Sequence, residues 1–203
     1  MPRLFTTGKQ RVLLAVALTV AVVVPATCAW LFRTRVFHGD PSLDAKTTVA
    51  PSRIPGAGNG LFAAVPIKKG EIIAEMGGKL VFHDRFPKAE RGYLFAAPPC
   101  AKWDLWPYDA LDGRVHGGRA SKINFAPRTL NGRETGFQNA RGFTMCRRPY
   151  VAFQATRDLA PGEEILTSYG PMYDYDFMDF PAVRDHFCHL LGEDCSTRYT
   201  WEP

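Results

Sequence analysis

Hydrophobic positions in this chain form one long uninterrupted run near the N-terminus and many short runs after it. Residues 12–32 carry no charge, and only Thr19, Pro25 and Thr27 interrupt their apolar character. A helix rises about 1.5 Å per residue, so a run of this length crosses a hydrocarbon core of about 30 Å. The pattern predicts one transmembrane helix or signal anchor over residues 12–32, preceded by a basic tail over residues 1–11.

A cleaved secretory signal peptide is the second interpretation of the same run. A basic start, an apolar core over residues 12–24 and small residues at 26–29 follow the order of such a leader. The anchor is favoured because the apolar run continues through residues 30–32. Basic residues lie on both sides, which leaves the orientation open. We therefore expect a single-pass membrane protein, with a secreted or lumenal protein after signal cleavage as the alternative.

After a polar linker over residues 33–47, the apolar runs are short and are bounded by glycine and proline. Strands are predicted at residues 61–65, 72–76, 79–82, 149–156 and 163–169, and the pair Gly77-Gly78 predicts a tight hairpin in a meander of the first strands. One helix is predicted over residues 179–193, with Pro181 in its first turn and Gly192 at its end. The pattern indicates a mainly β (α+β) fold of several small sheets.

Composition and charge exclude two broad classes of protein. Apolar residues make up 46% and charged residues 22% of the chain, which excludes global disorder. The formal net charge is +5, but the basic excess lies mostly in the first 45 residues, beside the apolar run. Direct nucleic-acid binding is therefore not expected.

The five cysteines are odd in number and widely spaced, and they form no C-x-x-C pair. A disulfide scaffold is therefore not expected, and a reducing compartment is favoured. His186, Cys188, His189 and Cys195 have side chains that bind zinc, but Cys188 and His189 are adjacent on the predicted helix, which suits tetrahedral geometry poorly. We expect no metal, and a Cys188–Cys195 disulfide is the less favoured alternative.

Three separated motifs carry a resemblance to a known family. Residues 52–63 are SRIPGAGNGLFA, residues 121–127 are SKINFAP, and residues 155–170 are ATRDLAPGEEILTSYG. Their order resembles the SET domain of protein lysine methyltransferases, which opens with G-x-G, continues with R-F-I-N-H-S-C and closes with G-E-E-[IL]-x-x-x-Y-G. The resemblance covers residues 48–173 and implies a SET-like fold with a C-terminal pseudoknot. Residues 174–203 are then a helical and aromatic extension.

The resemblance also implies an activity, with S-adenosylmethionine as the cofactor and a protein lysine side chain as the substrate. Methyl transfer needs a rigidly held cofactor and a neutral amine aligned behind the methyl group. The implied cofactor-binding residues are Gly58, Asn59, Gly60, Asn124, Phe125 and Tyr169, of which Tyr169 is also the implied catalytic residue. The implied substrate channel contains Tyr173, Phe177 and Trp201.

Each of these residues also has an ordinary structural interpretation. The glycines suit a plain turn, Asn124 suits a loop that it caps itself, and Tyr169 and the channel aromatics suit core packing. Glu163 and Glu164 resemble acids of an active site, but the family uses this turn to place its last strand, so their expected role is structural.

The chain departs from the family pattern at four positions. Phe125 stands where the family has His, Ser121 where it has Arg, Pro127 where it has Cys, and Met76 where it often has Tyr. Phe125 lacks the hydrogen bonds of a His ring. An alternative function is therefore a catalytically inactive SET-like interaction module that is tethered to a membrane.

Overall fold

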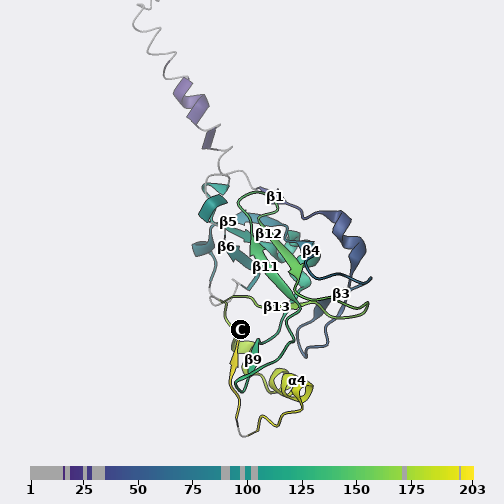
Figure 1. Cartoon of the computed structure of the whole chain (residues 1–203). Coiled ribbons are helices and arrows are strands. Elements are labelled where there is room, and N and C mark those ends of the chain that lie inside the picture. Colours follow the sequence, from purple (N-terminus) through teal and green to yellow (C-terminus); the bar gives the residue numbers. More distant parts are fainter. Residues whose placement is uncertain are drawn as a thin grey trace, which may run out of the picture. The chain divides into compact units, whose positions relative to one another are not determined.

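The computed structural model describes residues 16, 19–24, 27–28, 35–87, 92–96, 99–101, 105–170, 173–196 and 198–203 (Figure 1). The chain divides into two compact units, residues 1–35 and residues 36–203. In the part of the chain that the structure describes, no helix has both the length and the apolar character needed to cross a membrane. The predicted tail over residues 1–11 lies wholly outside the described residues and the predicted transmembrane helix over 12–32 largely so, and both stay predictions.

Residues 36–203 are built mainly from short strands in small sheets, as the sequence predicted. Within the described ranges there are five sheets, and in all but one of them the paired strands run antiparallel. The sheets are β1(Val36–Phe37)-β5(Gly78–Val81)-β7(Ala110–Asp112)-β6(Leu94–Ala96), β11(Ala140–Thr144)-β12(Val151–Ala155)-β4(Ile72–Glu75), β10(Arg133–Glu134)-β9(Thr129–Leu130)-β14(Trp201–Glu202), β2(Thr47–Pro51)-β3(Asn59–Ala63) and the parallel pair β13(Leu166–Thr167)-β8(Asn124–Phe125).

The helices are short, with one exception. The described 3-10 turns are η1(Pro41–Lys46), η2(His83–Arg85), η4(Pro99–Ala101), η5(Gly118–Lys122) and η6(Asp176–Asp179), and α3(Gly113–His116) is a single turn. The predicted helix is confirmed as α4(Pro181–Leu191). Pro181 stands at its first position, where no N–H is needed, and Gly192 ends it with a φ of 68°. Val183 and Phe187 face the core from α4.

The predicted hairpin at Gly77-Gly78 is wrong. β4 before these glycines pairs with β12, whereas β5 after them pairs with β1 and β7, so the two strands belong to different sheets. The glycines instead permit close packing of backbone, because a Cβ at Gly77 would stand against the carbonyl oxygens of His116 and Phe37. The first strands therefore do not form a meander.

Residues 33–47 were predicted to be a polar linker before a domain that begins at residue 48, but the compact unit begins at Val36. Val36 and Phe37 pair with β5, and the Phe37 ring packs edge-on against Tyr150 with ring centroids 5.6 Å apart. The carboxylate of Asp40 accepts a hydrogen bond from the Ser42 amide at 2.8 Å and caps η1. Residues 36–47 thus belong to the same compact unit as the rest of the domain.

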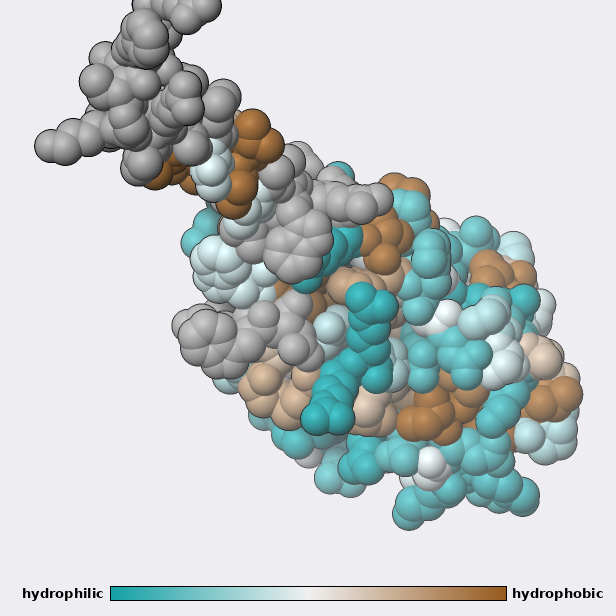
Figure 2. All heavy atoms as spheres, turned by 90° about the horizontal axis from the view of Figure 1, so that it is seen from above, coloured by the Kyte–Doolittle hydropathy of each residue, from teal (hydrophilic) through white to brown (hydrophobic). Residues whose placement is uncertain are grey.

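Three hydrophobic clusters form the core of this unit. One lies among β3, β4, β11 and β12, a second packs α4 against β8 and β9, and a third lies under β5 and β7. Figure 2 shows one face of the molecule, on which hydrophilic residues cover most of the described surface and hydrophobic ones gather in separate patches. The second cluster contains Phe125 and holds the candidate site.

The expectation about cysteine is wrong, because the unit contains two disulfides. Cys100 bonds to Cys146, and Cys188 bonds to Cys195, with Cα atoms 5.1 and 6.1 Å apart. Cys100 lies in η4 and Cys146 follows β11, so folding brings together residues 46 positions apart. Bonded to each other, Cys188 and Cys195 offer no thiolate to zinc, and the described residues hold no group of three metal-binding side chains.

Candidate functional site

The opening motif is a loop that leads into β3. The Ser52 amide donates a hydrogen bond to the carbonyl of Gly58 at 2.8 Å, which closes residues 52–58 into a tight loop. Gly58 has a φ of 70°, a conformation that glycine adopts without strain. A Cβ built at Gly58 would meet no atom within 4 Å. The backbone at Gly58 is therefore open to a neighbouring molecule.

Glu164 connects this loop to both of the other motifs. Its side chain is buried, with 5% of the residue exposed. One carboxylate oxygen, Oε1, accepts hydrogen bonds from Ser52 Oγ at 2.6 Å and from Asn124 Nδ2 at 3.3 Å, and Oε2 accepts one from the Arg53 amide at 2.9 Å. A Cβ at Gly60 would stand against Oε1, so only glycine fits beside this carboxylate. Glu164 thus fixes the three motifs relative to one another.

Glu163 makes contacts of its own within the closing turn. Burial raises the pKa of its carboxyl, but hydrogen bonds from Arg157 and from the Ala160 amide outweigh burial and hold the pKa below its usual value. Asn139 Nδ2 also donates to this carboxylate, at 3.3 Å. Glu163 therefore stays ionised at neutral pH, and its partners all belong to the fold.

Asn124 lies at the start of β8, directly opposite Leu166 of β13 in the parallel pair. Its Nδ2 donates to the Asn59 carbonyl at 3.2 Å and to Glu164 Oε1 at 3.3 Å. The two protons of this amide are thus directed toward the opening loop and the closing turn. The orientation of the Asn124 side chain is set by both outer motifs.

Phe125 is the centre of an aromatic cluster. The ring is buried and lies 4.7 Å from Tyr175, 5.8 Å from Tyr169, 5.8 Å from Phe177 and 6.0 Å from Trp201, measured between centroids. Tilted and edge-on pairs at such distances are favourable beyond the apolar area they bury. The residue that replaces the family His therefore packs rather than hydrogen-bonds.

Of the predicted channel residues, Tyr173 joins the cluster through Tyr169. The two ring centroids are 4.6 Å apart, and Tyr173 also lies 6.4 Å from Phe177. The structure therefore brings Tyr169, Tyr173, Phe177 and Trp201 into one connected group. Tyr175 is a member that sequence reasoning missed, and the only available signal was its place in the aromatic-rich stretch after the closing motif.

Tyr169 joins the closing motif to the central one. Its hydroxyl donates to the carbonyl of Ile123 at 3.0 Å. Burial raises the pKa of this phenol, and the neighbouring tyrosines, Tyr173 above all, raise it further. The side chain therefore remains a neutral hydrogen-bond donor across the physiological range and does not serve as a base.

Asn139 is a second residue that the sequence did not reveal. Only 1% of it is exposed, its Oδ1 accepts from the Leu166 amide at 2.9 Å, and its Nδ2 donates to the Glu164 carbonyl at 2.8 Å. These bonds hold the backbone of the closing motif on both sides of Ile165. A single Asn that lies outside the three motifs carries no signal of this role.

Comparison with known proteins gives a family match over most of this site. The family described as SET domain matches residues 58–170. N-lysine methyltransferase KMT5A-A of Danio rerio is 26% identical over 117 residues, which is 58% of this chain and 33% of that protein. The chain thus spans about a third of the length of this relative.

Solved structures resemble the chain in part. A humanized mutant of the Chaetomium thermophilum Polycomb Repressive Complex 2 bound to the inhibitor GSK126 has a TM-score of 0.48 and 26% identity, covering 64% of this chain and 15% of that one. The same complex in an autoinhibited conformation bound to S-adenosylmethionine has a TM-score of 0.46 and 23% identity, covering 70% and 16%.

Proposed function

Because this chain belongs to the SET domain family, we propose that it is an S-adenosylmethionine-dependent methyltransferase that acts on a protein lysine side chain. One observation carries the proposal. Glu164 and Tyr169 of the closing motif bind the opening loop and the central motif, so three segments far apart in the sequence meet at one place. The relative in Danio rerio is named for lysine methyl transfer, which supports the substrate class.

The residues present fit the proposed cofactor. Gly58 would hold it through its open backbone, Asn59 and Gly60 continue the same loop into β3, and Asn124 is hydrogen-bonded to the Asn59 carbonyl. Phe125 would contribute through its backbone, because its ring is enclosed by aromatic neighbours. The cofactor, when bound, supplies a methyl group on a positively charged sulfur, and aromatic rings such as Tyr169 attract that charge.

The aromatic cluster would prepare the lysine. A lysine amine has an unperturbed pKa of about 10.4, and desolvation lowers this pKa toward the neutral form that attacks. Phe177 and Trp201 of the second hydrophobic cluster, with the Tyr173 ring packed against Phe177, offer the apolar surface for such desolvation. The Tyr169 hydroxyl donates to Ile123, so its lone pairs are free to orient a methyl group through weak C–H···O contacts.

A second candidate function is an inactive SET-like interaction module. The observation that favours it is Phe125, which fills with a ring the position where the family has a hydrogen-bonding His. Measuring cofactor binding distinguishes the two functions, because an inactive module has no need to retain the cofactor. Measuring methyl transfer distinguishes them as well, since a module that binds the cofactor still leaves lysine unmodified.

The first experiment is isothermal titration of S-adenosylmethionine into residues 36–203 with both disulfides intact. The fragment begins at Val36 because β1 pairs with β5. We expect micromolar binding that Asn124→Ala abolishes and that the control Gln154→Ala, on β12, leaves unchanged. Folded fragment that binds nothing would refute the enzyme and leave the interaction module.

Methyl transfer is the second measurement. Radiolabelled cofactor is incubated with cell proteins and with the wild-type or Tyr169→Phe fragment. We expect labelled lysine with the wild type only, because the variant keeps the ring and loses the hydroxyl. Equal labelling by both proteins would remove Tyr169 from the catalytic role.

A further inference from the structure

Every cysteine of residues 36–203 is part of a disulfide. Cys100 pairs with Cys146 and Cys188 with Cys195, and the free cysteine, Cys28, lies in the apolar run before this unit. Disulfides of structural type persist in oxidising compartments, whereas cytosolic thiols are kept reduced. Complete pairing therefore indicates the compartment in which this unit folds.

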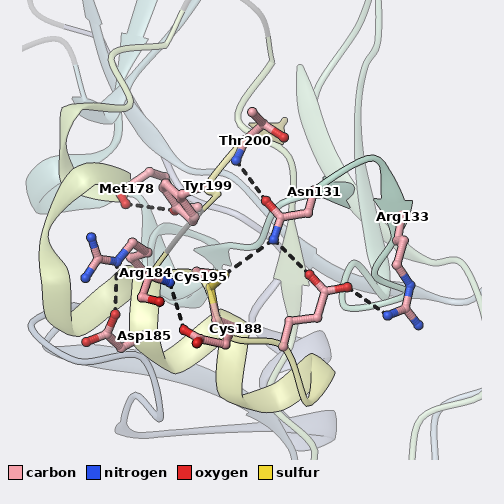
Figure 3. Close-up of a disulfide and its surroundings, with 12 residues drawn as sticks. Asn131, Arg133, Met178, Arg184, Asp185, Cys188, Cys195, Tyr199 and Thr200 are labelled. Carbon is pink, nitrogen blue, oxygen red and sulfur yellow. Dashed lines mark hydrogen bonds and ion pairs between the residues drawn. A yellow bond between two sulfur atoms is a disulfide. The ribbon is translucent and has the colours of Figure 1, made fainter.

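The Cys188–Cys195 disulfide ties the end of α4 to the segment that follows it (Figure 3). Both residues are buried, with 3% and 7% of their surfaces exposed. Glu193, inside this short loop, accepts from Asn131 Nδ2 at 2.8 Å and pairs with Arg133 at 2.7 Å. The loop is thereby fixed to the turn between β9 and β10.

Beyond Cys195, the same segment delivers two aromatic residues to the site. The Tyr199 hydroxyl donates to the Met178 carbonyl at 2.8 Å, and the Thr200 amide donates to Asn131 Oδ1 at 3.0 Å (Figure 3). Trp201, which lies in β14, then pairs with Leu130 of β9, and its ring packs against Phe125. The disulfide thus restrains the segment that completes the aromatic cluster.

The second disulfide differs in its surroundings. Cys100 and Cys146 are exposed, so small thiols reach this bond directly. A solvent-accessible disulfide in contact with a reducing glutathione pool exchanges with it through a mixed disulfide. The unit therefore carries one buried disulfide, Cys188–Cys195, and one exposed disulfide, Cys100–Cys146, and the exposed one needs an oxidising medium to last.

We propose that residues 36–203 fold and act in an oxidising compartment, on the lumenal or outer side of a membrane, and that their substrates are proteins of that compartment. The uncharged run over residues 12–32 supplies the segment that would direct the chain there, as an anchor or as a leader. The location rests on the disulfides, and the substrate class rests also on the proposed function. This reverses the reducing compartment that the cysteine spacing favoured.

Full-length chain translated with endoplasmic-reticulum microsomes tests the location. Protease is added with and without detergent, and cysteines are counted by maleimide–polyethylene glycol before and after reduction, in a Cys28→Ser background. We expect protection of the domain until detergent is added, no adduct before reduction and four adducts after it. Digestion without detergent, or four adducts before reduction, would overturn the proposal. If the domain is protected from protease, both an uncleaved chain and a chain that has lost its leader support the proposed compartment.

Paired variants connect the disulfides to the site. The double change Cys188→Ser and Cys195→Ser should weaken S-adenosylmethionine binding more than the double change Cys100→Ser and Cys146→Ser, because only the first frees Trp201. The location readouts need no methyl transfer. A protected, oxidised domain that binds no cofactor therefore contradicts the proposed enzyme alone, and a cofactor-binding domain with reduced cysteines on the cytosolic side contradicts the compartment alone.

Discussion

Replacing Glu164 by Gln tests whether one buried carboxylate holds the three motifs together. The carboxylate accepts from three donors, two at Oε1 and one at Oε2. Gln keeps a single acceptor oxygen and places an NH2 group where the other oxygen stood. With the carbonyl toward Ser52 and Asn124, the new NH2 faces the Arg53 amide, so two donors oppose each other.

The expected loss follows from that one position. A hydrogen bond to a charged group contributes about 1.5–3 kcal/mol, and a buried donor left unsatisfied costs about 1–3 kcal/mol. Because these two effects describe the same lost bond, we expect Glu164→Gln to lower the free energy of unfolding by about 2–3 kcal/mol. Glu163→Gln is the matched control, because the Glu163 side chain is 25% exposed. This change should lower the free energy of unfolding by about 1 kcal/mol or less.

Urea denaturation of residues 36–203, followed by tryptophan fluorescence, measures both variants. With a slope of about 2 kcal/mol per M, the Glu164→Gln midpoint should fall by about 1–1.5 M, without a change of slope. Cofactor affinity should fall with it, because the Arg53 amide loses its acceptor and the opening loop is held less firmly against the closing motif. A midpoint equal to that of Glu163→Gln would refute the argument, since it would mean that the carboxylate is not needed to join the motifs.

Two further predictions concern a glycine and a tyrosine. Gly60→Ala should abolish cofactor binding and destabilise the unit in urea, because its Cβ would displace the Glu164 carboxylate, whereas Gly58→Ala should cost only about 1 kcal/mol for its positive φ. Burial raises the pKa of Tyr199 to about 12, so its contribution is complete below the unfolded pKa of about 10 and is lost as pH rises toward 12. Unfolding free energies between pH 8 and about 12 should therefore decline less steeply in Tyr199→Phe, and equal slopes would contradict this assignment.

The sequence predicted those parts of the fold whose signals are local. α4 begins at a proline and ends at a glycine because both residues suit the backbone of helix ends. β3 and β12 were recognisable as short apolar runs between turns. The three motifs pointed to the candidate site residues because their order matches a family pattern, and the structure joins these motifs through Glu164 and Tyr169.

Pairing between distant segments could not be predicted in this way. The pair Gly77-Gly78 suits a hairpin locally, but β4 before it pairs with β12 and β5 after it pairs with β7, so the two strands do not pair with each other. The disulfide partner of Cys100 lies 46 residues away, and no spacing rule indicates Cys146. Asn139 looks like any loop residue until the Leu166 amide is placed against it. The predicted pseudoknot stays a prediction, as does the threading of the last segment.

The parallel pairing of β8 with β13 also has a kinetic consequence. Ser52 and Glu164 are 112 residues apart, and Ile123 and Tyr169 are 46 apart, so the site consists of contacts that close long loops. Such contacts form late, because the entropy of loop closure must be overcome before they contribute stability. Local elements such as α4 have no such delay. We expect the ligand-binding site to mature last, so that ligand added during refolding would capture only molecules whose folding is complete.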